Sequence, residues 1–154
     1  MDQNIKKNLA SNWFKTLQNM ICNDISKLEG SRVKFKSTNW QRNNQKDEGG
    51  GEYRILQNGK VFDKVGVNFS KVYGKFPKQF KKNILGAQKD PRFWASGISV
   101  VMHMKNPLIP AMHFNTRYIC TTFDWFGGGI DVTPSKKDNK AVSYTHLTLP
   151  TKVT

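Results

Sequence analysis

The chain has 154 residues, of which 37% are hydrophobic and 12% aromatic, so it can bury the core of one domain and is not a disordered chain. Its formal net charge of +14 would suit an anionic partner such as nucleic acid, an acidic membrane surface or a polycarboxylate ligand. Only five of the 25 basic residues are arginine, so we expect a solvated lysine-rich surface and no nucleic-acid partner, with a basic RNA- or anion-binding module as the alternative.

A long amphipathic helix is predicted over residues 4–29. Its apolar residues recur at helical spacing, and we expect them to form the buried face of the helix, packed against a sheet. This stripe consists of Trp13, Leu17, Met20, Ile21, Asp24, Ile25 and Leu28, all apolar except Asp24. Gly30 is predicted to end the helix.

Three strands are predicted after this helix, over residues 32–40, 53–56 and 60–73, because these stretches are rich in β-branched and aromatic residues. The Asn58-Gly59 pair between the last two predicts a hairpin turn. The polar stretch before the second strand ends in three glycines, 49–51, and we expect a flexible linker there. A buried sheet face is expected from Val61, Val65, Val67, Phe69 and Val72.

The second half of the chain begins with a short basic helix, predicted over residues 76–84. Two further strands follow, over 97–103 and 112–122, on either side of a turn at 105–110 that contains two prolines. No long helix alternates with the strands, so a parallel sheet is not expected. The predicted fold class is α+β, a mostly antiparallel β-sheet flanked by helices.

Polar residues gather on one face of these last two strands. Side chains alternate along a strand, so His113, Asn115 and Arg117 share a face, as do Ser99 and His103. In a hairpin closed by the proline turn, His103 is expected opposite His113 and Ser99 opposite Arg117, all on one face. The alternative is that this is only the solvated face of a hairpin.

The residues on this face indicate a substrate with several carboxylates. The planar guanidinium of Arg117 matches a carboxylate, and His113 can give or take a proton near neutral pH. The glycines at 127–129 let the backbone come close to a ligand, and Asp131 adds a carboxylate that can accept from a polar N–H group.

A metal site is a further possibility that two histidines raise. His103 and His113 could be two ligands of a divalent metal, but catalytic sites usually supply three protein ligands. The remaining histidine, His146, lies near the end of the chain. A hydrogen-bonded histidine pair is the alternative, and we favour it over a bound divalent metal.

The cellular location is expected to be the cytoplasm. Cys22 and Cys120 have no metal-ligand spacing, which favours free thiols in a reducing compartment. The start of the chain lacks the apolar region of a signal peptide, and no apolar run approaches the roughly 20 residues of a membrane span.

The stretch from Gly97 to Pro134 also resembles a known family. It contains GISVVMHMKNPLIPAMHFNTRY and then WFGGGIDVTP, an order of residues similar to that of oxygen-dependent coproporphyrinogen III oxidase. Met104 and Val132 depart from the family pattern, which usually has proline and leucine there, and neither departure affects a polar group. The resemblance extends upstream through Gly49–Gly74.

The resemblance implies a broad antiparallel sheet between helices, assembled as a homodimer. It implies an oxidoreductase of haem biosynthesis that converts two propionates of coproporphyrinogen III to vinyl groups, giving protoporphyrinogen IX. Molecular oxygen would be the co-substrate, and no organic cofactor would be required.

The resemblance also implies roles for individual residues. His113 matches the histidine proposed as proton donor, and Asp131 matches an aspartate that contacts the pyrrole nitrogens. The residues that match substrate-binding positions are Ser99, Asn115, Thr116 and Arg117.

The end of the chain departs from the family pattern. Family members continue well beyond Pro134, whereas this chain ends in SYTHLTLPTKVT, which resembles a translated sequencing adaptor. We therefore expect residues 1–141 to be the N-terminal part of a single oxidase domain and residues 142–154 to be a non-native tail. The chain is expected to be truncated relative to the family and inactive by itself.

Overall fold

The strands follow one another across a single antiparallel sheet in the order in which they occur in the chain. The structure is a computed structural model, and it describes residues 1–30, 33–79, 81–134 and 147–148. Its strands are β1 (Lys36–Gln41), β2 (Gly49–Gln57), β3 (Phe62–Lys75), β4 (Arg92–Met104), β5 (Ala111–Cys120), β6 (Asp124–Thr133) and β7 (Leu147–Thr148). The predicted α+β class with a mostly antiparallel sheet is confirmed.

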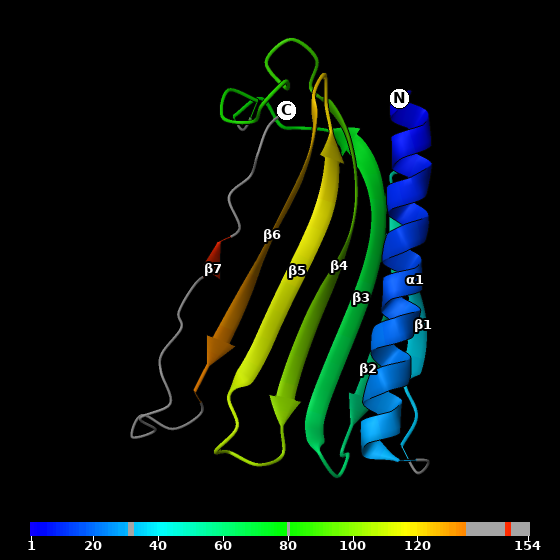
Figure 1. Cartoon of the computed structure of the whole chain (residues 1–154). Helices are drawn as coiled ribbons and strands as arrows, with labels where there is room; N and C mark the ends of the chain where they lie inside the picture. Colours follow the sequence, from blue (N-terminus) through cyan, green and yellow to red (C-terminus); the bar gives the residue numbers. More distant parts are fainter. Residues whose placement is uncertain (31–32, 80, 135–146, 149–154) are drawn as a thin grey trace.

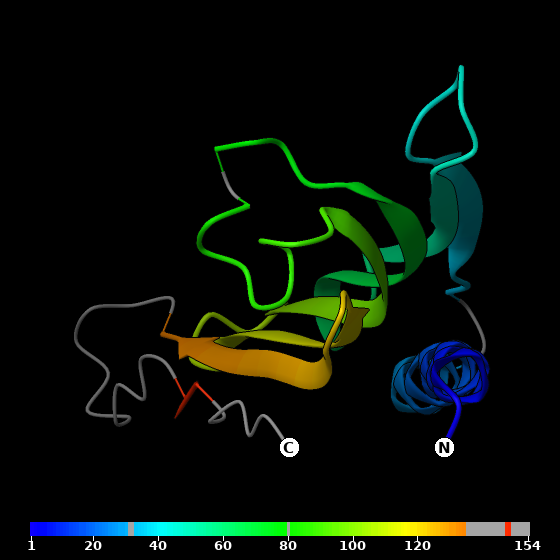
Figure 2. The same cartoon turned by 90° about the horizontal axis from the view of Figure 1, so that it is seen from above.

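Helix α1 (Gln3–Glu29) lies along one face of the sheet, across β3 and β4 (Figure 1). The connection between β3 and β4 lies on the opposite side of the sheet, as the view from above shows (Figure 2). The helix begins where the Asp2 carboxylate accepts a hydrogen bond from the Asn4 amide at 3.1 Å. It ends at Gly30, as predicted, with a φ of 79°.

The buried face of α1 differs from the predicted stripe. Trp13 is 53% exposed and Leu28 65% exposed, so the prediction that they belong to the core is wrong. The residues that are buried instead are Ala10, Ser11, Phe14, Gln18, Cys22, Ile25 and Glu29.

Two buried polar residues explain this error. The Gln18 amide donates to the backbone carbonyls of Glu52 and Val67, at 2.9 and 3.1 Å, and the Glu29 carboxylate accepts from the turn between β2 and β3. A pattern based on hydrophobicity places such residues on the surface. The real buried face is therefore turned by roughly one residue, or about 100°, from the predicted one.

The core lies between α1 and the middle of the sheet. Its fully buried side chains come from alternate positions on β2 to β5 and from one face of α1. They include Phe14, Leu56, Val65, Val67, Val100 and Tyr118. Two residues of the predicted buried sheet face lie elsewhere. Val61 is 40% exposed because it lies in the turn before β3. Val72 points to the other face of the sheet, because side chains alternate along β3 and Val72 is an odd number of residues away from Val65 and Val67.

Three glycines that we expected in a linker are part of β2. Gly50 and Gly51 pair with Gln41 and Trp40 of β1, and Gly49 pairs with Val72 of β3. A Cβ on Gly50 or Gly51 would collide with a backbone carbonyl of the neighbouring strand, so glycine is needed for the strands to approach. The linker prediction is therefore wrong. The first predicted strand is also shorter than expected, because β1 begins only at Lys36.

The hairpin predicted at Asn58-Gly59 is confirmed. Asn58 has a φ of +58°, and the Gly59 amide donates to the Phe62 carbonyl at 2.9 Å.

The short helix predicted over residues 76–84 is wrong, because the described residues there form turns. This connection is fixed by side chains at the end of β5: the Thr121 hydroxyl donates to the Leu85 carbonyl at 2.8 Å and the Thr122 hydroxyl to the Gly86 carbonyl at 3.0 Å. Gly86, two residues beyond the predicted helix, has a φ of +74°, a backbone conformation that glycine adopts readily.

Most of the predicted non-native tail lies outside the described residues, namely 142–146 and 149–154. Within it, Leu147 and Thr148 pair with Ile130 and Gly129 of β6. The division at residue 141 stays a prediction.

Candidate active site

All the predicted site residues except Thr116 lie on the face of the sheet that points away from α1. Tyr118 and Val100 face the helix and are buried, so their strand neighbours face the other way. This places Ser99 and His103 of β4 on the same face as the site residues of β5. The imidazole Nε2 atoms of His103 and His113 are 3.4 Å apart. The prediction that the two histidines share a face on neighbouring antiparallel strands is confirmed.

The pairing of these strands differs by two residues from the predicted one. Val101 lies opposite His113, Ser99 opposite Asn115 and Gly97 opposite Arg117. The predicted pairs are therefore wrong, and the last pair before the turn is Met102 with Met112. A shift of two residues preserves the alternation of side chains, so the same residues stay on the same face.

The last residues of β4 pair only with β3. Pairing between β4 and β5 ends at Met102 and Met112, and His103 then pairs with Lys64 of β3. In the turn, the Asn106 side-chain oxygen accepts from the Leu108 amide at 2.9 Å, which organises the loop locally.

Strand β6 brings Asp131 next to the histidines. Asp131 lies directly opposite His113, with 3.7 Å between its Oδ2 atom and the histidine Nδ1 atom. The Thr133 hydroxyl donates to the same carboxylate oxygen at 2.6 Å. The carboxylate is therefore held beside the imidazole, and it can orient that ring or accept from a ligand N–H group.

The glycine triplet lies within β6. Gly127 and Gly129 lie opposite Arg117 and Asn115, on the face of the site. A Cβ on Gly127 would meet no atom within 4 Å. Glycine therefore leaves the strand flat beside Arg117, where a planar ligand could approach the backbone.

Arg117 is exposed, and its Nη2 atom donates to the Asn115 side-chain oxygen at 2.9 Å. Thr116 is the predicted site residue that does not join this group. It lies opposite Ile98 and Gly128, on the face that carries α1.

The histidine pair fits two alternatives. A separation of 3.4 Å suits a weak N–H···N hydrogen bond, and it is also close to the separation of about 3.3 Å between two nitrogens bound to one tetrahedral ion. Across the described part of the chain, no three His, Cys, Asp or Glu side chains are grouped to hold a metal ion. The two histidines are thus an incomplete ligand set, and metal binding stays a prediction.

Two residues on this face were missed from the sequence. Asn68 of β3 lies directly opposite Ser99, and the indole of Trp40 on β1 donates to the Asn68 oxygen at 2.9 Å. Alternation within the β3 stretch puts Asn68 on one face with Gly66 and Ser70. Only the pairing of β3 with β4 shows that this face is the one with the histidines.

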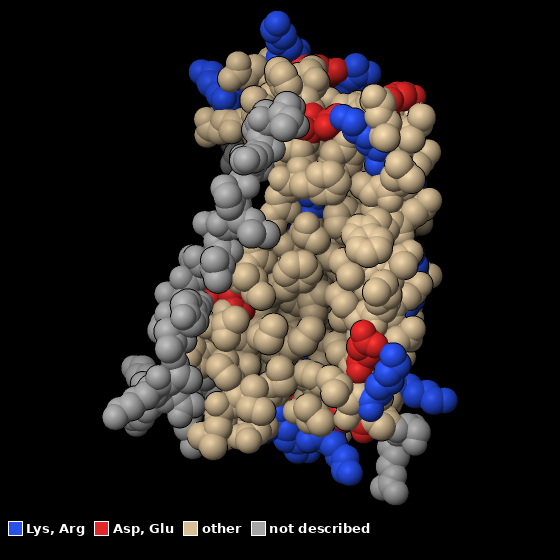
Figure 3. Space-filling view, viewed as in Figure 1, with Lys and Arg blue, Asp and Glu red and all other residues tan. Residues whose placement is uncertain are grey.

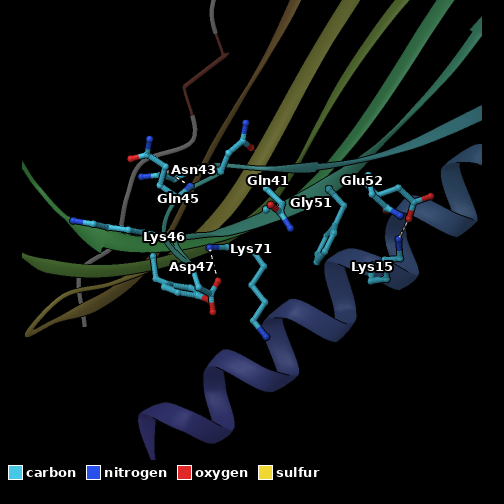
Figure 4. Close-up of a pocket in the computed structure, with 15 residues that line it drawn as sticks. Lys15, Gln41, Asn43, Gln45, Lys46, Asp47, Gly51, Glu52 and Lys71 are labelled. Carbon is cyan, nitrogen blue, oxygen red and sulfur yellow. Dashed lines mark hydrogen bonds and ion pairs between the residues drawn. The ribbon is translucent and has the colours of Figure 1, made fainter.

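A cavity of about 660 Å³ lies on the opposite face, between α1 and the ends of β1 to β3 (Figure 4). Four of its side chains contact one another in pairs: Lys15 pairs with Glu52, and Tyr73 donates to Asp47. The guanidinium of Arg54, with Lys15, lowers the pKa of Glu52 to about 2. These groups stabilise each other, and the cavity contains none of the predicted site residues.

The middle of the helix-bearing face carries little charge. Lys, Arg, Asp and Glu side chains gather at the two ends of the strands (Figure 3). Within this face, Phe126 of β6 is 57% exposed although its ring stacks on Tyr118, with 4.6 Å between ring centroids. Among the described residues, no helix is long and apolar enough to cross a membrane.

Comparison with known proteins finds one family. The family model described as coproporphyrinogen III oxidase matches residues 9–154. An oxygen-dependent coproporphyrinogen-III oxidase of Rickettsia felis is 48% identical over 147 residues, covering 90% of this chain and 51% of the relative. The protein of the same name from Rickettsia typhi is 46% identical over 148 residues, covering 91% and 52%. The one from Rickettsia akari is 49% identical over 136 residues, covering 83% and 47%. The chain therefore spans about half the length of the curated relatives that it matches.

Proposed function

We propose that this chain, which belongs to the coproporphyrinogen III oxidase family, is part of an enzyme that decarboxylates coproporphyrinogen III with molecular oxygen. Two propionates become vinyl groups, and the product is protoporphyrinogen IX. The observation that carries the proposal is the single face on which β5 and β6 bring together His113, Arg117 and Asp131.

The proposed decarboxylation gives each of these three residues a role. Each propionate loses carbon dioxide together with two electrons and one proton, and with one further proton these reduce one molecule of oxygen to hydrogen peroxide. The exposed guanidinium of Arg117 holds a propionate carboxylate. Asp131 accepts from a pyrrole N–H, which favours the electron-rich ring that reacts with oxygen. His113, beside Asp131, gives or takes the proton that is transferred in the reaction.

No organic cofactor enters this scheme, because oxygen itself accepts the electrons. A divalent metal at His103 and His113 would need at least one further ligand from outside the described residues. We assign the complete enzyme to the cytoplasm, in line with the two free, buried cysteines.

The rest of the enzyme is proposed to cover the apolar part of the sheet. Exposed Phe126 and the uncharged middle of the helix-bearing face are surfaces that a stable protein normally buries (Figure 3). Further family polypeptide, and a second subunit of a homodimer, would bury them. Residues 1–141 are then the N-terminal part of one oxidase domain with residues 142–154 outside it, and the chain alone is inactive.

The test is turnover with and without oxygen. A complete protein carrying this sequence should convert coproporphyrinogen III in air, measured as vinyl-porphyrin fluorescence after oxidation of the product. The chain alone should give no product. Equal turnover under strict anoxia would refute the proposed reaction, and product from the chain alone would refute its dependence on further polypeptide.

A further inference from the structure

A row of three polar side chains crosses the middle of the candidate site. Asn68 of β3 lies opposite Ser99 of β4, and Ser99 lies opposite Asn115 of β5. Directly opposed residues of an antiparallel sheet point to the same side, with Cβ atoms about 4.5–5.5 Å apart. The three side chains therefore form a continuous row about 10 Å long.

Both asparagines in this row are oriented by a neighbouring donor. The indole Nε1–H of Trp40 donates to the Asn68 Oδ1 atom at 2.9 Å, and the Arg117 Nη2 atom donates to the Asn115 Oδ1 atom at 2.9 Å. Indole and guanidinium N–H groups can only donate, so each carbonyl oxygen must face its partner. Each side-chain NH₂ group is then the end directed away from that partner.

The position of Trp40 depends on a glycine of the neighbouring strand. Trp40 lies opposite Gly51 of β2, and its ring crosses over this glycine to reach β3. A Cβ on Gly51 would lie 2.9 Å from two ring carbons of Trp40, closer than any side chain permits. The glycine is thus required for the indole to lie across β2 and to hold the Asn68 amide.

We propose that Asn68 is a substrate-binding residue: with Ser99 and Asn115 it forms a row of hydrogen-bond donors for one carboxylate of the substrate. Trp40 is a positioning residue that acts through the Asn68 amide. This inference rests on the proposed function, which supplies a substrate with four propionates. A carboxylate accepts several hydrogen bonds and donates none, so it suits a row of amide and hydroxyl donors, with Arg117 at its end adding positive charge.

The row also orients the substrate. The next row along the strands, two residues or about 7 Å away, contains His113 and the acceptor Asp131. A pyrrole N–H needs an acceptor and a propionate needs donors, so the two rows bind different parts of one ring. The propionate lies over Asn68, Ser99 and Asn115, and the ring nitrogen lies toward Asp131.

The experiment measures the affinity of a complete protein carrying this sequence for coproporphyrin III, the oxidised tetracarboxylate, by fluorescence titration. Asn68→Asp replaces the donor by a negative charge but keeps an acceptor for the indole, and should weaken binding about tenfold or more. The control, Asn39→Asp, adds the same charge to exposed Asn39 of β1, which faces the other side of the sheet opposite Glu52. It should change the affinity less than about twofold.

Trp40→Phe tests the positioning role, because it keeps an aromatic ring but removes the indole N–H. Alone it should weaken binding about threefold or more, whereas in the Asn68→Asp background it should add nothing, since it acts through that amide. In the unaltered protein, the side-chain NH₂ resonances of Asn68 should shift when coproporphyrin III is added.

The outcomes separate this inference from the function on which it rests. Failure of the unaltered complete protein to bind coproporphyrin III removes the support for both. Binding by the unaltered protein together with equal affinities for Asn68→Asp and Asn39→Asp overturns the donor row alone. Additive effects of the Trp40 and Asn68 substitutions overturn the positioning role.

Discussion

Replacing Glu29, the last residue of α1, should destabilise the protein far more than an ordinary substitution at a helix end. Glu29 is only 5% exposed, and its carboxylate accepts hydrogen bonds from the backbone amides of Lys60, Val61 and Phe62, at 2.5, 3.0 and 2.5 Å. These amides belong to the turn between β2 and β3 and to the first residue of β3. The carboxylate thus joins the C-terminal end of the helix to the hairpin that carries Asn68.

The expected magnitude follows from what Glu29→Ala leaves behind. One hydrogen bond to a charged group contributes about 1.5–3 kcal/mol, and a buried donor without a partner costs about 1–3 kcal/mol. The three bonds share one carboxylate, so they do not add fully. We expect a loss of about 3–5 kcal/mol in the free energy of unfolding. Glu29→Gln keeps one acceptor oxygen and should cost about half as much.

Urea unfolding followed by circular dichroism measures this loss. Asp24→Ala is the matched control, because Asp24 lies on the same helix and its ion pair with Lys27 is exposed at both ends. That pair should contribute less than about 0.5 kcal/mol.

A double-mutant cycle with Gly59 makes the test sharper. A Cβ at Gly59 would collide with the Glu29 carboxylate, so Gly59→Ala should cost less when Glu29 is already alanine. Equal losses for Glu29→Ala and Asp24→Ala would refute the reasoning, as would strictly additive effects of the Glu29 and Gly59 substitutions.

Three further predictions concern the site, the pH dependence and the core. Arg117→Ala should weaken coproporphyrin III binding by about 1.5–3 kcal/mol in the same titration, and unchanged affinity would remove Arg117 from the site. The pKa of Glu52 is about 2 in the folded chain, below its ordinary value of 4.5, so the stability that this carboxylate contributes should be complete above about pH 4.5 and lost toward pH 2. The difference in urea midpoint between the unaltered protein and Glu52→Gln should therefore shrink as the pH falls over that range, and a constant difference would contradict this. Phe14→Ala should cost about 3–5 kcal/mol of unfolding free energy and Trp13→Ala less than about 1 kcal/mol, and the reverse order would mean that the helix packs by its predicted stripe.

Local patterns in the sequence were sufficient for the elements whose causes are local. The α1 helix and its end at Gly30, the Asn58-Gly59 turn and the strands around the histidines follow from spacing, backbone freedom and β-propensity. The face shared by His113 and Arg117 was also predictable, because alternation along a strand does not depend on which residue lies opposite.

The tertiary structure alone decided the features that depend on a partner in space. The sequence did not show which face of α1 is buried, because Gln18 and Glu29 are buried through hydrogen bonds to backbone groups that are distant in the chain. The glycines at 49–51 belong to a strand because neighbouring carbonyls approach them, and a sequence cannot show this approach.

The candidate site divides in the same way. The sequence by itself determined the residue types and their order, and through them the family. The register between β4 and β5 depends on the length of the turn, and the place of Asn68 beside Ser99 depends on a strand pairing across about 30 residues of chain. Such long-range pairing is set by the packing of the whole sheet against α1, so only the folded structure brings Trp40 and Asn68 to the face that carries the histidines.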